Sequence, residues 1–430
     1  MEIPVPFSPM KNRGDRVLII LMVAMGMVSI WLWPRWFPAA EKQAGWDEES
    51  YTWVACSIRL SGANFLKAFG KSFMTDDKTM HQVAPNRVLL PLWLGWGWQD
   101  PEKVTVRDVR GRMNTVRAGW LILCGLICWK ELGRRRGLLA FVFLASSPLF
   151  IGTGQRVWAD WLLGLWLTAA LWGAWRWWND GKIGWWWLIL ICGLLAAATK
   201  ETTMLYLGGS GFLLGWLSLV FWWNRRKGTS FKQLGFFWVA WVLVAASLGI
   251  WLTWLYGGIF PFIERTGNIA TANLFSRAFS GGPWFRYAVD ELLINPLVCL
   301  LAIGTLLGFN RDVYPSPWRA WFWSVIAVFS ILPFKDLRYL CLLDLPLAMA
   351  AATQVAVWSQ RRGKIFGLAL AIFIFGSELY QAQKIFVDTK TYGVNTYDLI
   401  RADGFLGPPS KKSEEDNAGP SSFFKHYRTN

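Results

Sequence analysis

Residues 159–177 read ADWLLGLWLTAALWGAWRW, and the only charges in this run, Asp160 and Arg176, stand near its two ends. A helix rises about 1.5 Å per residue, so roughly 20 apolar residues cross the hydrocarbon core of a bilayer. Similar apolar blocks recur from residue 16 to residue 381. The pattern predicts an all-α polytopic membrane protein, and it excludes a water-soluble enzyme, a disordered chain and a coiled coil.

The apolar blocks predict about eleven transmembrane helices. They lie near residues 16–36, 112–131, 137–153, 159–177, 184–199, 203–223, 235–257, 292–309, 319–334, 340–358 and 365–381. No small-residue cleavage site follows the first block, so we expect an uncleaved span rather than a signal peptide. Tryptophans gather at the block ends, where an indole ring favours the headgroup level.

The charge of the chain is distributed as in a membrane protein. The 430 residues carry a net charge of +16, and 54% of them are hydrophobic. Lys and Arg are concentrated in alternate short loops, which predicts a cytoplasmic N-terminus and makes nucleic acid an improbable partner. The two histidines exclude a His-rich zinc site. The six cysteines suggest no disulfide framework, and no P-loop or Rossmann motif offers a soluble nucleotide donor a site.

Two parts follow from this topology. Residues 1–381 form a transmembrane domain with a long first outward loop, 37–111, in which 47–60 and 85–98 are expected as helices lying at the membrane interface. A second outward loop covers about 258–291. Residues 382–430 form an outward tail that is expected to be partly disordered.

Asp47 and Glu48 are the first candidate catalytic groups. They follow the first span, where a carboxylate can act as a general base on an acceptor hydroxyl. The alternative interpretation is an acidic N-terminal helix cap, which on these residues alone is the more common role.

Arg156, Asp160 and Lys200 form a second group at predicted outward ends of spans. Arg156 and Asp160 are four residues apart, so they can simply pair on one helix face. Functionally, Asp160 can orient a substrate while Arg156 faces an anion. Lys200 can bind a lipid phosphate or extend to the headgroups.

Lys335, Arg338 and Tyr339 lie between the ninth and tenth spans, again on the outward side. Positive charge is disfavoured there, and a guanidinium can hold a phosphate with two hydrogen bonds. We therefore favour a phosphate-binding role over ordinary loop charges.

The order of these features resembles the GT-C superfamily of polytopic glycosyltransferases, and within it the protein O-mannosyltransferase-like and aminoarabinose-transferase-like branch. The resemblance rests on four stretches across roughly residues 40–350. They are Asp47-Glu48 with Tyr51; Arg117 to Gly137 with Ser147-Pro148-Leu149, Arg156 and Asp160; Gly193 to Lys200; and Lys335 with Arg338-Tyr339-Leu340. Two departures concern the segment 86–92, where many relatives have Pro-Pro-Leu, and Glu201, which replaces a common Gly-Pro.

This resemblance implies transfer of a sugar from a polyprenyl phosphate to a hydroxyl of a lipid, glycan or protein, on the extracytoplasmic face of a bacterial inner membrane. The catalytic residues would be Asp47, Glu48 and Asp160, with Asp47 as the base. The lipid phosphate or sugar would contact Arg156, Lys200, Lys335, Arg338, Tyr339 and Arg87. No metal ligand is predicted, no cofactor is required, and a divalent ion is optional.

Three alternatives remain open at this point, and one of them, a non-catalytic membrane scaffold, would leave the outward charges without a purpose. A secondary transporter would use Asp160, Lys200 and Glu201 as coupling sites, but transporters usually show repeated halves and sites near the midplane of the bilayer. An O-antigen ligase or polymerase would use arginines of the second outward loop, namely Arg265, Arg277 and Arg286.

Overall fold

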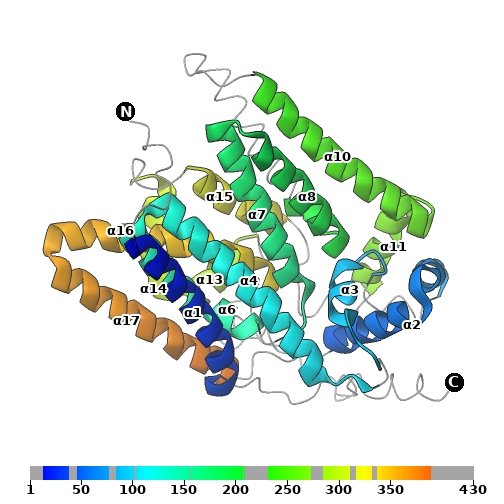
Figure 1. Cartoon of the computed structure of the whole chain (residues 1–430), viewed down its shortest axis with the longest axis horizontal. Helices are drawn as coiled ribbons and strands as arrows, with labels where there is room; N and C mark the ends of the chain where they lie inside the picture. The colour runs from blue at the N-terminus through cyan, green and yellow to red at the C-terminus, as the bar shows by residue number, and fades with distance from the viewer. Residues whose placement is uncertain are drawn as a thin grey trace.

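The computed structural model consists of helices throughout its described part (Figure 1). It describes residues 13–37, 46–76, 84–100, 103–154, 156–206, 208, 231–272, 284–309, 316–331 and 337–388. No strand occurs within these ranges. The prediction of an all-α chain is therefore confirmed for this part of the molecule.

Eight helices of the first half of the chain lie completely within the described ranges. They are α1 (Arg13–Trp36), α2 (Trp46–Thr75), α3 (Leu89–Gly95), α4 (Val106–Leu132), α5 (Arg134–Ser146), α6 (Pro148–Thr153), α7 (Ala159–Asp180) and α8 (Ile183–Thr199).

The described ranges of the second half hold seven α-helices, a 3₁₀ helix and a π-helix. They are α10 (Phe231–Tyr256), α11 (Ile259–Ala272), α13 (Arg286–Ile294), α14 (Pro296–Leu307), α15 (Ser316–Ile331), the 3₁₀ helix η3 (Leu337–Leu343), α16 (Asp344–Arg362), α17 (Lys364–Ala382) and the π-helix η4 (Gln383–Asp388).

Each span predicted within the described ranges coincides with one helix or with two consecutive helices. By length and composition, three described helical segments are long and apolar enough to cross a membrane: 235–256, 338–362 and 364–387. Two shorter apolar helices, α8 and α14, accompany them. The sixth predicted span, 203–223, lies mostly outside the described residues, as does the tail from residue 389.

The predicted span 137–153 is broken into α5 and α6 at Ser147-Pro148. Proline is well tolerated at the first position of a helix, where its missing N–H costs nothing. The Ser147 hydroxyl accepts a hydrogen bond from the backbone N–H of Phe150 (3.3 Å) and donates one to Asp344 (2.7 Å). The break therefore caps α6 and also ties it to the start of α16.

Helix α2 is longer than the predicted interfacial helix 47–60. It continues to Thr75 through Gly62, whose φ of 61° is a left-handed conformation that glycine adopts at little cost. The chain kinks at this residue, and α2 thus consists of two helical parts on either side of Gly62. The second predicted interfacial segment, 85–98, contains the short helix α3 (Figure 1).

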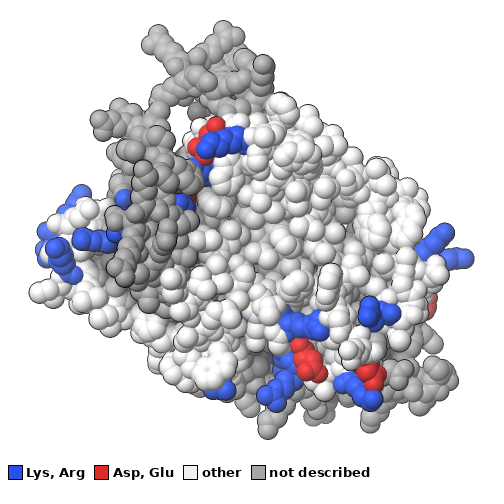
Figure 2. Space-filling model, in the orientation of Figure 1, with Lys and Arg blue, Asp and Glu red and all other residues white. Residues whose placement is uncertain are grey.

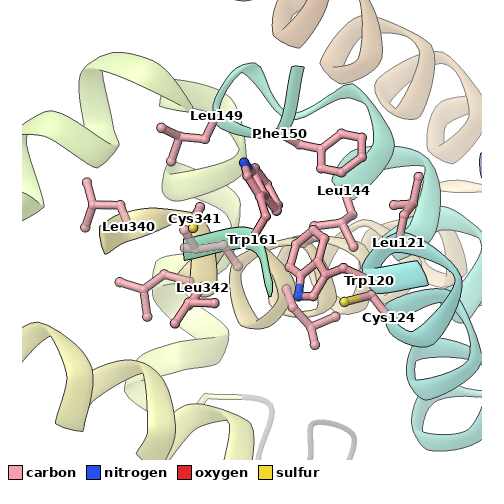
Figure 3. Close-up of a cluster of buried hydrophobic side chains, with 14 of the residues drawn as sticks. Trp120, Leu121, Cys124, Leu144, Leu149, Phe150, Trp161, Leu340, Cys341 and Leu342 are labelled. Carbon is pink, nitrogen blue, oxygen red and sulfur yellow. The ribbon is translucent and has the colours of Figure 1, made fainter. Parts of the chain in front are cut away.

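A buried aromatic cluster is formed by side chains of α4, α6 and α7, close to residues of η3 (Figure 3). The Trp161 ring meets Trp120 edge-on at 5.0 Å between centroids, and Phe150 at 5.4 Å. Aromatic pairs in this geometry add about 0.5–1.5 kcal/mol beyond their buried area. Because Trp161 follows Asp160, and Leu340 and Cys341 follow Arg338, this packing fixes two of the candidate site segments.

The outer faces of several helices carry large apolar side chains. Exposed examples are Val242 and Ile250 on α10, and Ile365, Leu368 and Phe373 on α17. Most of the face seen in Figure 2 is uncharged, and the charged groups gather toward its edges. Such an extensive apolar exterior is typical of a protein solvated by lipid.

Candidate active site

An ion pair between Asp47 and Arg338 connects the predicted first outward loop to the Arg338-Tyr339 segment. Asp47 stands in the first turn of α2, and Arg338 stands in η3. The Arg338 guanidinium donates to the Asp47 carboxylate at 2.5 Å. Both side chains are about one-fifth exposed, so the pair is reachable from outside the protein.

Asp160 and Lys200 form a second pair behind the first. Asp160 lies in the first turn of α7, and Lys200 immediately follows α8. The Lys200 ammonium donates to Asp160 at 2.7 Å, and both side chains are almost completely buried. Burial lowers the pKa of Lys200, and the neighbouring Asp160 partly opposes that shift.

Arg338 links the two pairs into one network. Its Nε lies 3.8 Å from Asp160 Oδ2, while another of its nitrogens holds Asp47. The four groups, which we call the charge network, are Asp47, Asp160, Lys200 and Arg338. Helices α2, α7, α8 and η3 each supply one member, as predicted for a site gathered from distant parts of the chain.

Two aromatic rings flank the charge network. Tyr339 lies 4.9 Å from Lys200 Nζ, measured to the ring centroid, and its backbone oxygen accepts from the Tyr206 hydroxyl at 3.3 Å. The Arg338 guanidinium lies 5.6 Å from the centroid of the Trp158 ring. Cations near aromatic faces are stabilised by the ring quadrupole.

Glu48 faces a different set of partners from its neighbour Asp47. Its carboxylate accepts from Arg110 (2.7 and 2.9 Å), from Arg156 (3.3 Å) and from the backbone N–H of Val157 (3.2 Å). These donors supply the buried carboxylate with charge-assisted hydrogen bonds. In this arrangement Glu48 joins the start of α2 to α4 and to the segment before α7.

Arg87 lies beside the charge network and binds Glu201. Its Nε donates to Glu201 at 2.9 Å, a second nitrogen also contacts Glu201, and a third donates to the Tyr51 hydroxyl at 3.3 Å. Burial alone would raise the pKa of Glu201, but Arg87, with a smaller effect of Lys200, lowers that pKa to about 2. Burial also raises the pKa of Tyr51, with a smaller opposing effect of Arg87.

The sequence predictions can now be placed residue by residue. Five predicted residues meet in one place: Asp47, Asp160, Lys200, Arg338 and Tyr339. Glu48 and Arg156 pair with each other next to them, and Arg87 is connected through Tyr51 and Glu201. Lys335 lies outside the described residues.

Sequence reasoning missed Arg110, Asn86 and the pairing role of Glu201. The Asn86 amide donates to Glu201 at 3.1 Å, and Asn86 also exchanges hydrogen bonds with Tyr256. Arg110 and Glu48 are 62 residues apart, and Asn86 and Tyr256 are 170 apart, so no local spacing signals either contact. For Glu201, the sequence offered one indication of a role in the site, namely its position next to Lys200.

The alternatives raised by the sequence receive less support. Of the arginines expected for a ligase, Arg265 donates to backbone oxygens of Phe73 and Asp76, and Arg286 pairs with Asp290. Arg277 lies outside the described residues. Within the described ranges, no group of three or more His, Cys, Asp or Glu side chains is arranged to hold a metal ion.

Comparison with known proteins supports the same architecture. No family model matches the chain, and no curated protein matches it. Solved structures do match it, among them ArnT from Cupriavidus metallidurans in the apo state (13% identity, TM-score 0.52, covering 91% of this chain and 75% of the other). Another is the same protein bound to undecaprenyl phosphate (15% identity, TM-score 0.54, covering 92% and 76%). At this identity the likeness concerns the fold. The chain therefore shares the fold of these ArnT structures.

Proposed function

We propose that this protein is a membrane glycosyltransferase that moves a sugar from a polyprenyl phosphate to an acceptor hydroxyl. The observation that carries the proposal is the charge network, in which two carboxylates and two cations from four separate elements converge on one end of the fold. The comparison with ArnT bound to undecaprenyl phosphate supports a lipid-phosphate ligand of this kind.

The reaction is a direct displacement at the anomeric carbon of the sugar. The acceptor oxygen forms a bond to that carbon while the bond from the carbon to the phosphate oxygen breaks. Asp47 accepts the proton of the acceptor hydroxyl, and the polyprenyl phosphate leaves with the electron pair. One base and no covalent intermediate give inversion at the sugar carbon.

The cations of the charge network stabilise the leaving phosphate. Fixed positive groups in a poorly hydrated site lower the energy of a developing anion, because they need no reorganisation during the reaction. Arg338 is partly exposed and pairs with Asp47, so an incoming phosphate competes with that carboxylate for the same guanidinium. When Arg338 turns to the phosphate, Asp47 is freed to act as the base. Lys200 supports the site from behind through Asp160.

The other polar groups hold this arrangement in place. Glu48, bound by Arg110 and Arg156, fixes the first turn of α2 and thereby the position of Asp47. The Arg87–Glu201 pair fixes the turn that carries Lys200. The extracytoplasmic location of the reaction follows from the predicted positive-inside topology.

The first experiment is a transfer assay in membranes with radiolabelled polyprenyl-phosphate sugars. We expect Asp47→Asn to insert and fold normally but to lose at least ~10²-fold in transfer, the usual contribution of a general base. Asp180→Asn is the matched control, because Asp180 also pairs with an arginine, Arg176, at 2.7 Å, but at the far end of α7. Equal transfer by the wild type and Asp47→Asn would remove Asp47 from the mechanism.

A further inference from the structure

Trp158 stands at a position of the site where local structure does not favour a tryptophan. It is the N-cap of α7, with extended backbone angles (φ −118°, ψ 136°), and its side chain makes no capping hydrogen bond. Ser, Thr, Asp and Asn are preferred there because they accept a bond from the first helical N–H groups. A tryptophan at this position forgoes that stabilisation, typically ~1 kcal/mol.

The exposure of Trp158 differs from that of its neighbours. Val157, Ala159, Asp160 and Trp161 are all nearly completely buried, whereas Trp158 is partly exposed. No hydrogen bond joins its indole N–H to another described residue. Part of this residue is therefore open to solvent, and the Arg338 guanidinium lies over one side of its ring.

The exposed surface lies beside the reactive groups. Arg338 is 5.6 Å from the Trp158 ring centroid and holds Asp47 at 2.5 Å. Asp47, Arg338, Trp158 and Tyr339 are all partly exposed, whereas Asp160 and Lys200 lie behind them. A molecule that approaches Asp47 and Arg338 thus meets the indole at the same time.

We infer that Trp158 is the platform on which the sugar of the donor lies, so that it determines which sugars the site accepts; this rests on the proposed transferase function. A pyranose presents C–H groups on its faces and hydroxyls around its rim. Such a face loses apolar area to water when it lies on an aromatic ring. The phosphate next to the anomeric carbon then reaches Arg338, and Asp47 remains on the side from which the acceptor arrives.

The chemical class follows from this geometry. The favoured donors are polyprenyl phosphates that carry a pyranose with one continuous C–H face. The indole N–H is available to a hydroxyl at the rim of that sugar. A lipid phosphate without a sugar gains nothing from Trp158, because its anionic group is held by the cations alone.

Binding of two kinds of lipid, without and with a sugar, to the purified protein tests the inference. The ligands are undecaprenyl phosphate and polyprenyl-phosphate pyranoses, one hexose and one pentose, each in competition with labelled undecaprenyl phosphate. We expect Trp158→Ala to weaken binding of the preferred sugar-bearing lipid at least ~10-fold, which equals ~1.4 kcal/mol. Binding of undecaprenyl phosphate should change less than about twofold, and Trp158→Phe should recover most of the loss. Trp187→Ala, which removes an indole exposed on α8, should affect neither ligand.

Each other outcome is decisive. An equal loss for both lipids would mean that Trp158 only positions Arg338, and no loss for either would mean that the ring does not meet the ligand. A wild type that binds no sugar-bearing lipid better than undecaprenyl phosphate would also overturn the inference. The proposed function fails differently, namely when the wild type transfers none of the sugars that it binds. The thermal unfolding midpoint of Trp158→Phe shows whether the fold is intact.

Discussion

Asp160 and Lys200 are each less than 4% exposed and lie 2.7 Å apart, so neither charge has water as an alternative partner. Removing one member of a buried pair leaves the other charge uncompensated and typically costs 3–5 kcal/mol. Replacing both members often costs much less, because the desolvation penalty of both charges disappears.

This asymmetry gives a prediction for two variants. Asp160→Asn should lower the free energy of unfolding by about 3–5 kcal/mol, whereas Asp160→Asn combined with Lys200→Met should regain much of that loss. Transfer activity should stay absent in both. Apparent unfolding midpoints in detergent and the membrane transfer assay separate the two effects. Recovery of transfer in the double variant would show that the pair serves only to hold the fold.

Glu201 shows how the same reasoning gives a pH dependence. Its pKa in the folded protein is about 2, against an ordinary value of 4.5. A depressed carboxyl pKa stabilises the fold above the unfolded pKa, and that contribution disappears as the pH falls from about 4.5 toward 2. At roughly 1.4 kcal/mol for each unit of pKa, the contribution is about 3 kcal/mol.

We therefore expect Glu201→Gln to be less stable than the wild type at pH 7, and the difference to shrink below pH 4.5 and nearly vanish near pH 2. The measurement is the unfolding midpoint of both proteins across this range. Glu264→Gln, at an exposed position on α11, is the control and should follow the wild type throughout. A difference between Glu201→Gln and the wild type that does not shrink on acidification would contradict the assigned pairing with Arg87.

At the scale of helices, the contact between α4 and α5 depends on Gly137. A Cβ added there would lie 2.7 Å from the backbone oxygen of Cys128 and 2.7 Å from Cα of Trp129. Backbone atoms cannot move aside as a flexible side chain can, so the two helices would have to separate. The turn between them is short, because Gly133 serves both as the last cap of α4 and the first of α5.

Gly137→Ala should consequently lower stability by about 1–3 kcal/mol, the usual cost of overpacking. Gly119→Ala on α4 is the control, because the nearest heavy atom to its added Cβ is 3.9 Å away. There the higher helix propensity of alanine should leave stability unchanged or slightly raised. Thermal unfolding of the two variants in the same detergent gives the comparison, and similar midpoints would contradict the close approach of α4 and α5.

Most helices could be predicted from the sequence, and the reason is physical. Long apolar blocks in a bilayer have few options besides a helix, so the length and position of α1, α4, α7, α10 and α17 follow from composition. The bounds of the interfacial helices are harder to predict from the sequence, because their faces are only partly apolar. Helix α2 continued beyond residue 60 since Gly62 permits a bend that hydrophobic periodicity does not reveal.

The charged residues of the candidate site could be predicted from the sequence. The residues that hold them in place could not. Asp47, Asp160, Lys200 and Arg338 attract notice because ionisable groups near a membrane need a reason. Arg110 and Asn86 sit in polar segments where such residues are ordinary, and only the tertiary structure brings them to Glu48 and Glu201. Trp158 was hidden among the 32 tryptophans of the chain.

At the scale of the whole molecule, the topology can be tested from both ends of the bundle. Residues just before α4 and at the start of α7 and α16 belong to the end that carries the charge network, and the turn between α16 and α17 lies one helix length away (Figure 1). In a cysteine-free background, a cysteine at Lys103 should react with a membrane-impermeant maleimide in intact cells. A cysteine at Lys364 should react only after permeabilisation. The reversed pattern would place the site on the cytoplasmic side and exclude the proposed reaction there.

The ion pair between Asp47 and Arg338 joins positions 291 residues apart. During biosynthesis, α2 leaves the ribosome long before η3 is translated, so the nascent polypeptide holds a carboxylate whose counter-ion does not yet exist. In the proposed mechanism, transfer can begin only after η3 has been translated and has docked against α2. A polypeptide truncated anywhere before η3 would therefore be unable to complete the site.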